Sequence, residues 1–92
     1  MSAYIVVDMT PIDPEKLKEY GAAAAPTVAK FKGEFVFKAP IEVLAGSAEH
    51  TNKVLIQFPD KSSAQAWYRS DEYQALIPLR NEAMHSHFHL LA

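Results

Sequence analysis

The stretch AYIVVDMTPIDPEKL, residues 3–17, decides how the chain begins, because it changes from the pattern of a strand to that of a helix. Residues 3–9 are mostly β-branched or aromatic and too few for a helix of ordinary length, so they predict a strand. Asp13 can accept backbone N–H bonds as a helix cap, and Pro14 suits the first helical position, where its missing donor does no harm. The chain therefore opens with a strand that leads directly into a helix.

The predicted first helix has one apolar stripe, whose members lie three or four residues apart: Leu17, Tyr20, Ala24, Val28 and Phe31. Pro26 interrupts the stripe, so we expect a kink near Ala22 or a helix in two pieces. Gly33 follows the stripe, and we expect it to take the positive φ that commonly ends a helix.

The rest of the chain continues the alternation of strands and helices. The predicted elements are a long strand over 34–38 and 41–44 bent at Ala39-Pro40, a strand over 53–58, a helix opened by a Ser62/Gln65 capping box, a short helical piece from Ser70, and a strand over 84–91. The order is β-α-β-β-α-β. It predicts one α+β domain over residues 1–92 with a ferredoxin-like fold, in which a four-stranded antiparallel sheet carries the helices on one face.

Strand alternation divides the sheet residues into two sets. The set assigned to the helix-covered face is apolar: Ile5, Val7, Met9, Phe35, Phe37, Val54, Ile56, Phe58, Phe88 and Leu90. The opposite set mixes apolar and polar residues: Tyr4, Val6, Asp8, Val36, Lys38, Glu42, Leu44, Leu55, Gln57, His85, His87 and His89. Such a face is too apolar for water and too polar for a dry core. We therefore expect a homodimer that packs two uncovered faces around a partly wet cavity.

The last strand places His85, His87 and His89 at every second position, so that all three share the uncovered face. Neighbouring imidazoles on one strand face lie about 7 Å apart and the outer pair about 13 Å, so one ion cannot bind all three. A metal site would need a further ligand, such as Asp8 or Glu42. The other interpretations are an acid–base role for one histidine or plain lining of the dimer cavity; we predict no metal.

For an acid–base reaction, the best candidates are His87 in the middle of its strand and Asp8 or Glu42 to orient its ring. An organic ligand could be held by aromatic and basic side chains of the helices and the last strand, namely Tyr20, Trp67, Tyr68, Tyr73, Arg80, His85 and His89. The alternatives are purely structural roles: core packing for the aromatic residues, and helix capping or an ion pair with Glu82 for Arg80.

Composition excludes several classes of protein. A net charge of −2 with scattered lysines gives no basic surface for nucleic acid. No apolar run approaches the length of a membrane helix, and residues 1–11 predict a strand rather than a secretion signal. Zero cysteines exclude disulfides and thiolate chemistry, and three glycines cannot form a phosphate-binding loop, so we predict no cofactor and a cytoplasmic location.

Two segments resemble a known family. FPDKSSAQAWYRSDEYQALIPLR (58–80) and YGAAAAPTVAKFKGEF (20–35) are similar to an uncharacterised domain-of-unknown-function family of small bacterial proteins in the dimeric α+β barrel superfamily. The chain departs from that pattern at Lys32-Gly33, where a Gly-Gly pair is expected, at KAP (38–40), where a glycine-containing bend is usual, and at Gln57, where a glutamate is usual. The missing glutamate weakens any shared carboxylate chemistry.

The resemblance implies a homodimer with a barrel between its two sheets and one pocket in each subunit. Relatives in that superfamily include cofactor-free monooxygenases, haem enzymes and lactone isomerases, so the fold does not select a reaction. Two hypotheses therefore remain. One is a dimer that binds a small, largely apolar organic molecule, with cofactor-free acid–base or oxygenation chemistry; the other is a noncatalytic ligand-binding or structural dimer.

Overall fold

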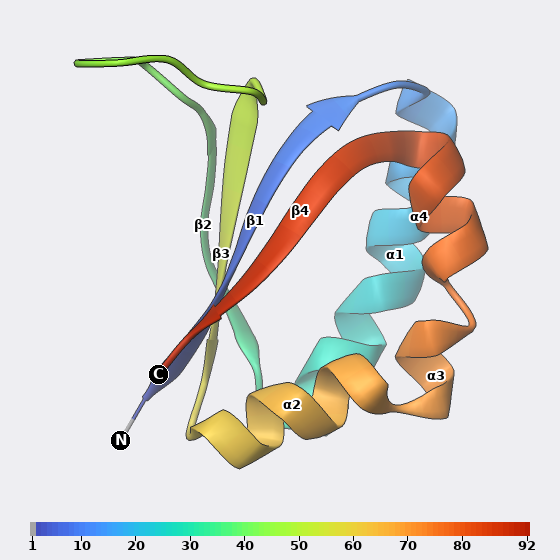
Figure 1. The fold of residues 1–92 in the computed structure, drawn as a ribbon. Helices are drawn as coiled ribbons and strands as arrows, with labels where there is room; N and C mark the ends of the chain where they lie inside the picture. The colour runs from blue at the N-terminus through green and yellow to red at the C-terminus, as the bar shows by residue number, and fades with distance from the viewer. Residues whose placement is uncertain (1) are drawn as a thin grey trace.

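The structure is a computed structural model that describes residues 2–92. Its elements are β1 (Ala3–Pro11), α1 (Pro14–Lys30), β2 (Glu34–Pro40), β3 (Asn52–Phe58), α2 (Lys61–Arg69), α3 (Asp71–Gln74), α4 (Ile77–Ala83) and β4 (Met84–Leu91). The strands form one antiparallel sheet in the order β2-β3-β1-β4, and the helices lie together on one side of it (Figure 1). The predicted ferredoxin-like fold is confirmed. Within residues 2–92 no helix is long and apolar enough to cross a membrane.

The two longest helices, α1 and α2, begin at acidic caps. Asp13 Oδ1 accepts the backbone N–H groups of Glu15 and Lys16, as the sequence predicts for α1. Asp60 Oδ1 accepts the N–H of Ser63 at 2.7 Å, so the cap of α2 is Asp60 and the predicted Ser62 capping box is wrong. The helix α1 runs without a break across Pro26, which excludes the alternative of two helical pieces.

The end of α1 differs from the prediction in which residue takes the left-handed conformation. Lys32 has a φ of 63°, whereas Gly33 does not have a positive φ. Lys32 N–H bonds to Ala29 O and Gly33 N–H bonds to Val28 O, which is the Schellman pattern of a helix C-terminus. Gly33 is needed for another reason: a Cβ there would lie 2.5 Å from Phe58 Cε1 and 2.7 Å from Val28 Cγ1.

The core lies between the sheet and the helices, as predicted from the apolar residues assigned to the helix-covered face. Its largest fully buried side chains are Trp67, Tyr73, Phe58 and Val28. The rings of Trp67 and Tyr73 lie 4.3 Å apart, and Phe58 packs on Trp67 at 5.5 Å. These contacts join α2 and α3 to β3, so Trp67 and Tyr73 are part of the hydrophobic core.

A β-bulge in β2 corrects two of the face assignments. The pairing of β2 with β3 shifts between Phe35 and Phe37, so that Phe37 is opposite Leu55 and Lys38 is opposite Val54. One extra residue reverses the alternation. Phe37 therefore lies on the uncovered face, where its side chain is 68% exposed, and Lys38 lies on the helix side.

The segment after β2 also differs from the prediction, because it is a loop rather than a continuation of the strand. β2 ends at Pro40, and residues 41–51 form a loop that extends away from the helices (Figure 1). Glu42 and Leu44, which we assigned to the uncovered face of a long strand, thus lie in this loop and are exposed. The two ends of this loop are joined by a backbone hydrogen bond from Ile41 N–H to Thr51 O at 3.0 Å.

Two glycine substitutions test the packing at the end of α1. Gly33→Ala should lower the free energy of unfolding by about 1–3 kcal/mol, because the added methyl group meets Phe58 and Val28. Gly21→Ala is the matched control, since nothing lies within 4 Å of its Cβ position, and it should raise stability by up to about 1 kcal/mol through helix propensity. Urea unfolding at one protein concentration measures both; equal effects would contradict the close packing.

Candidate functional site

A hydrogen-bonded chain of polar groups crosses the helix layer from the core to the edge of the sheet. Tyr20 Oη and Tyr73 Oη lie 2.7 Å apart, and Arg80 Nη1 donates to both Tyr73 Oη and Tyr68 Oη at 3.1 Å. These residues come from α1, α2, α3 and α4. This series of hydrogen bonds therefore ties Arg80 to three helices other than its own.

Arg80 is a half-buried cation without an acidic partner. Its guanidinium carbon lies 4.7 Å from the centre of the Phe88 ring, and its buried Nε has no hydrogen-bond partner. Within residues 2–92 no carboxylate lies within ion-pair distance of it. Glu82, the partner considered from the sequence, binds Lys16 instead at 2.5 Å.

Burial and hydrogen bonding shift the pKa values of the side chains in this hydrogen-bonded series. Burial raises the pKa of Tyr20 above its usual range, and the adjacent Tyr73 hydroxyl adds to the rise. Burial also raises the pKa of Tyr73, although the hydrogen bonds from Tyr20 and Arg80 oppose it. For Arg80, burial lowers the pKa, but the hydrogen bonds to Tyr68 and Tyr73 outweigh burial and the net shift is upward. The phenols of Tyr20 and Tyr73 are thus neutral, and the Arg80 guanidinium is charged, at physiological pH.

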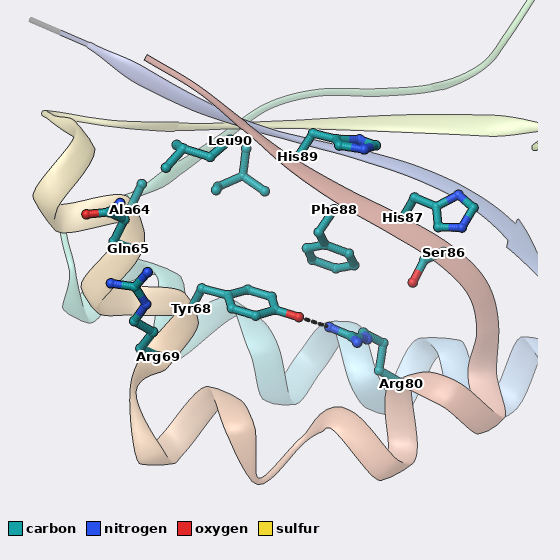
Figure 2. A pocket seen from close by; sticks show the side chains of 11 residues that line it. Ala64, Gln65, Tyr68, Arg69, Arg80, Ser86, His87, Phe88, His89 and Leu90 are labelled. Atoms are coloured by element: carbon teal, nitrogen blue, oxygen red, sulfur yellow. Dashed lines mark hydrogen bonds between the residues drawn. The ribbon is translucent and has the colours of Figure 1, made fainter.

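Arg80 lies at one end of a cleft of about 450 Å³ between β4, α2 and α4. Figure 2 shows Tyr68 and Arg80 on the helix side of this cleft and Phe88 and Leu90 pointing down from β4. The remaining residues that line it are Ile5, Ala64, Gln65, Arg69, Ser86, His87 and His89. The cleft combines flat apolar walls with one fixed cation, a combination suited to a small organic anion.

A second cavity, of about 330 Å³, lies between α1 and the sheet and is almost entirely apolar. Tyr20 and Trp67 line it on the helix side, and Val7, Val54 and Phe35 line it on the sheet side. Lys38 contributes its one cationic side chain. Phe88 lines both cavities and separates them.

The histidines of β4 lie on the uncovered face, as predicted. Their register opposite Thr10, Asp8 and Val6 places His85, His87 and His89 on the side of the sheet away from Phe88. His87 and His89 border the cleft with their strand, but their rings point to the other side from Arg80 (Figure 2). Tyr73, 0% exposed, lines neither cavity, and Trp67, 1% exposed, lines only the apolar one.

Of the two residues proposed to orient His87, the structure places Asp8 beside it and Glu42 in the loop. Asp8 is the direct cross-strand neighbour of His87, but its carboxylate binds Lys53 Nζ at 3.1 Å. Glu42 lies in the loop and makes no contact with His87. The carboxylate found beside His87 belongs to Glu49. The acid–base role of His87, Asp8 and Glu42 stays a prediction.

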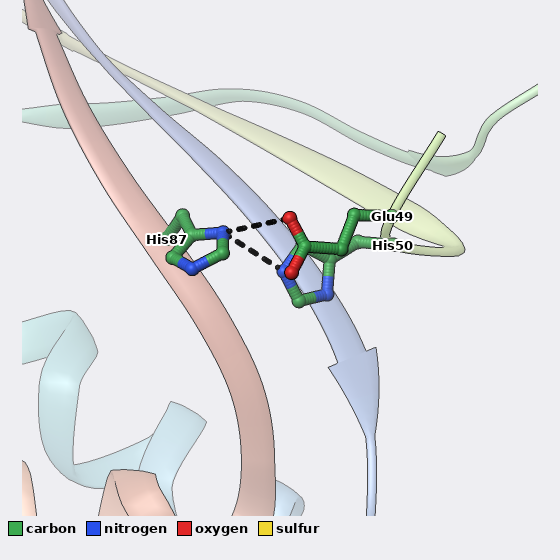
Figure 3. Close-up of side chains that lie close together, drawn as sticks. All are labelled: Glu49, His50 and His87. Atoms are coloured by element: carbon green, nitrogen blue, oxygen red, sulfur yellow. Dashed lines mark hydrogen bonds and ion pairs between the residues drawn. The ribbon is translucent and has the colours of Figure 1, made fainter. Parts of the chain in front are cut away.

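The loop before β3 forms a side-chain group that the sequence patterns do not predict. His50 in this loop is half-buried, and its Nε2 lies 3.1 Å from His87 Nδ1. Figure 3 shows His50 and Glu49 facing His87 across β1. Periodicity could not find this group, because the loop before β3 has no repeating pattern to place it.

Comparison with known proteins gives a family and a fold. A family model described as a domain of unknown function (DUF1330) matches residues 2–92. Curated proteins gave no significant match.

Solved structures with the same fold cover nearly the whole chain. A protein of unknown function from Rhodopseudomonas palustris has a TM-score of 0.78 at 16% identity, with 98% of this chain and 80% of that chain covered. A dimeric ferredoxin-like protein of unknown function from Jannaschia sp. CCS1 has a TM-score of 0.75 at 16% identity, with 100% and 99% covered. SnoaB, a cofactor-independent oxygenase from Streptomyces nogalater, has a TM-score of 0.72 at 13% identity, with 99% and 91% covered. These identities support the fold alone.

The buried tyrosines predict how stability depends on pH. Their pKa values are higher in the folded chain than in the unfolded chain, so the unfolded chain loses these protons first as the pH rises. The free energy of unfolding should therefore not depend on these tyrosines below pH 10 and should decrease above it. The decrease should be less steep in Tyr20→Phe than in the wild type. Urea unfolding at several pH values measures this; a slope that Tyr20→Phe leaves unchanged would contradict it.

Proposed function

The chain belongs to the DUF1330 family, and we propose that it is a homodimeric binding protein for a small, largely apolar organic molecule that carries an acidic oxygen. The observation that carries the ligand class is Arg80, a half-buried guanidinium that faces the cleft without a carboxylate among residues 2–92 to neutralise it. Catalysis is not part of this proposal.

The donors of Arg80 support an anionic ligand. Its Nη1 donates to two phenol hydroxyls, and its Nη2 makes no hydrogen bond within residues 2–92. Burying a cation is unfavourable unless it is paired, and neutral phenols offset this only in part. A carboxylate, phenolate or enolate oxygen at Nη2 would supply a charge-assisted hydrogen bond. The chain of tyrosines holds the guanidinium ready for it.

The walls of the cleft support an apolar body for the ligand. Phe88 and Leu90 from β4, together with the ring of Tyr68 from α2, which packs against Phe88 with 5.8 Å between the ring centroids, provide a continuous apolar surface. A volume of about 450 Å³ falls within the range of small-molecule sites, about 300–1,000 Å³. An aromatic or unsaturated acid fits both the walls and the cation.

The uncovered sheet face supports the homodimer. It carries Phe37, 68% exposed, and Leu91, 57% exposed, on either side of the half-buried Val6 and Leu55. The adjoining loop adds two exposed aliphatic residues, Val43 and Leu44. A second copy of the same face would bury these side chains and keep the polar ones in contact with trapped water. The Jannaschia protein of the same fold is described as dimeric.

Arg80→Met tests the ligand proposal. With a set of aromatic carboxylic acids and phenols screened by ligand-observed NMR, the best wild-type ligand should bind about 10- to 100-fold more weakly to this variant, because a charge-assisted hydrogen bond is lost.

The control is Arg69→Met, which removes the same charge from an exposed side chain lining the same cleft. Its affinity should stay within a few-fold of the wild type. Arg80→Lys keeps the charge and shows whether a merely misfolded site explains the loss. Equal affinity in Arg80→Met and the wild type, or no binding by any acid in the set, would contradict the proposal.

Val6→Asp tests the dimer. The added carboxylate would have to be buried between the two sheets, so this variant should run as a monomer where the wild type is a dimer. Size-exclusion chromatography with light scattering measures both at one concentration. Ile12→Asp, at an exposed apolar residue outside the uncovered face, should leave the dimer intact. A wild-type monomer, or a dimeric Val6→Asp, would contradict the interface.

A further inference from the structure

We propose that Glu49, His50 and His87 bind one divalent transition-metal ion, with Zn²⁺ as the ion to test. The three side chains each offer one ligand atom, and these atoms lie within 4.8 Å of one another. They come from two elements far apart in sequence, the loop before β3 and the middle of β4 (Figure 3). The inference is independent of the ligand cleft, since these rings lie on the other side of β4 from Arg80.

The two imidazole nitrogens lie close to the spacing that a metal ion requires. His50 Nε2 and His87 Nδ1 lie 3.1 Å apart. Two nitrogens bound tetrahedrally at about 2.0–2.1 Å from Zn²⁺ lie about 3.3 Å apart. The rings therefore need to separate by only a few tenths of an ångström to admit the ion.

The carboxylate needs a larger but easy adjustment. Glu49 Oε2 lies 3.8 Å from His87 Nδ1, and a carboxylate oxygen and a nitrogen on one zinc ion lie about 3.4 Å apart. The Glu49 side chain is 77% exposed and sits on a loop, so nothing holds it away from that position. Two imidazoles and one carboxylate leave a fourth position for water or for an atom of a bound molecule.

A second contact orients one of the ligands. His50 Nδ1 lies 3.0 Å from Thr10 Oγ1, on β1. With the hydroxyl oxygen as acceptor, Nδ1 carries the proton and Nε2 keeps its lone pair facing His87. Such a hydrogen bond on the far nitrogen is the usual way in which a protein fixes a metal-binding histidine. It also distinguishes His50 from a histidine that is near His87 by chance.

The donor set favours a transition metal over Mg²⁺ or Ca²⁺, which prefer oxygen ligands throughout. A bound ion would occupy the Nδ1 lone pair of His87. His87 would then be a ligand rather than a proton carrier, so the metal hypothesis and the acid–base hypothesis predict different results for the same residue.

Isothermal titration with ZnCl₂ alone, in a buffer that does not bind metal, tests the site on the whole chain. We expect one ion per chain in the wild type. His50→Ala and His87→Ala should each weaken binding at least about 100-fold, because loss of a ligand exceeds the 10- to 100-fold effect of losing an outer contact. Glu49→Gln should weaken it less, and Thr10→Val by about tenfold.

The matched control is His89→Ala, which removes a histidine from the same strand and the same face but outside the group. It should bind Zn²⁺ as the wild type does. Long-range ¹H–¹⁵N NMR should show the shifts on His50 Nε2 and His87 Nδ1. Wild-type binding no tighter than that of the His50→Ala/His87→Ala double variant, or an equal loss in His89→Ala, would overturn the proposal.

Discussion

The structure depends on one constraint: all the helices pack on a single face of a four-stranded sheet. Strand alternation then sends every second residue into a dry aromatic core and the others to a face that its own chain does not cover. The contrast is clearest on β4, where Phe88 packs into the core while His87 and His89 point outward. The cleft, the metal-binding group and the proposed dimer surface all follow from that separation.

The aromatic core also prepares the cleft. Tyr73 stacks on Trp67 inside the core and uses its hydroxyl to accept from Arg80 and to contact Tyr20. A residue that stabilises the fold therefore also sets the position of the Arg80 guanidinium in the cleft. This coupling explains why the segment 67–80, which carries the family resemblance, contains core and candidate site residues together.

Regular patterns in the sequence predicted the regular parts of the structure. Alternation gave β4 its observed limits, and the Asp13-Pro14 pair gave the start of α1. The misses occur where one residue breaks a pattern or where no pattern exists. The bulge before Phe37 exchanges the faces of two side chains, and Lys32 rather than Gly33 takes the left-handed conformation. Glu49 and His50 meet His87 through a loop whose path depends on tertiary contacts such as that of His50 with Thr10.

We propose that the uncovered face is closed by a second copy of the chain and that each subunit binds one small organic acid. Native mass spectrometry of the freshly purified protein tests both parts in one measurement. We expect twice the mass of one chain, with up to two bound small molecules that are lost on denaturation. A chain that remains single at micromolar concentration and carries no small molecule would contradict it.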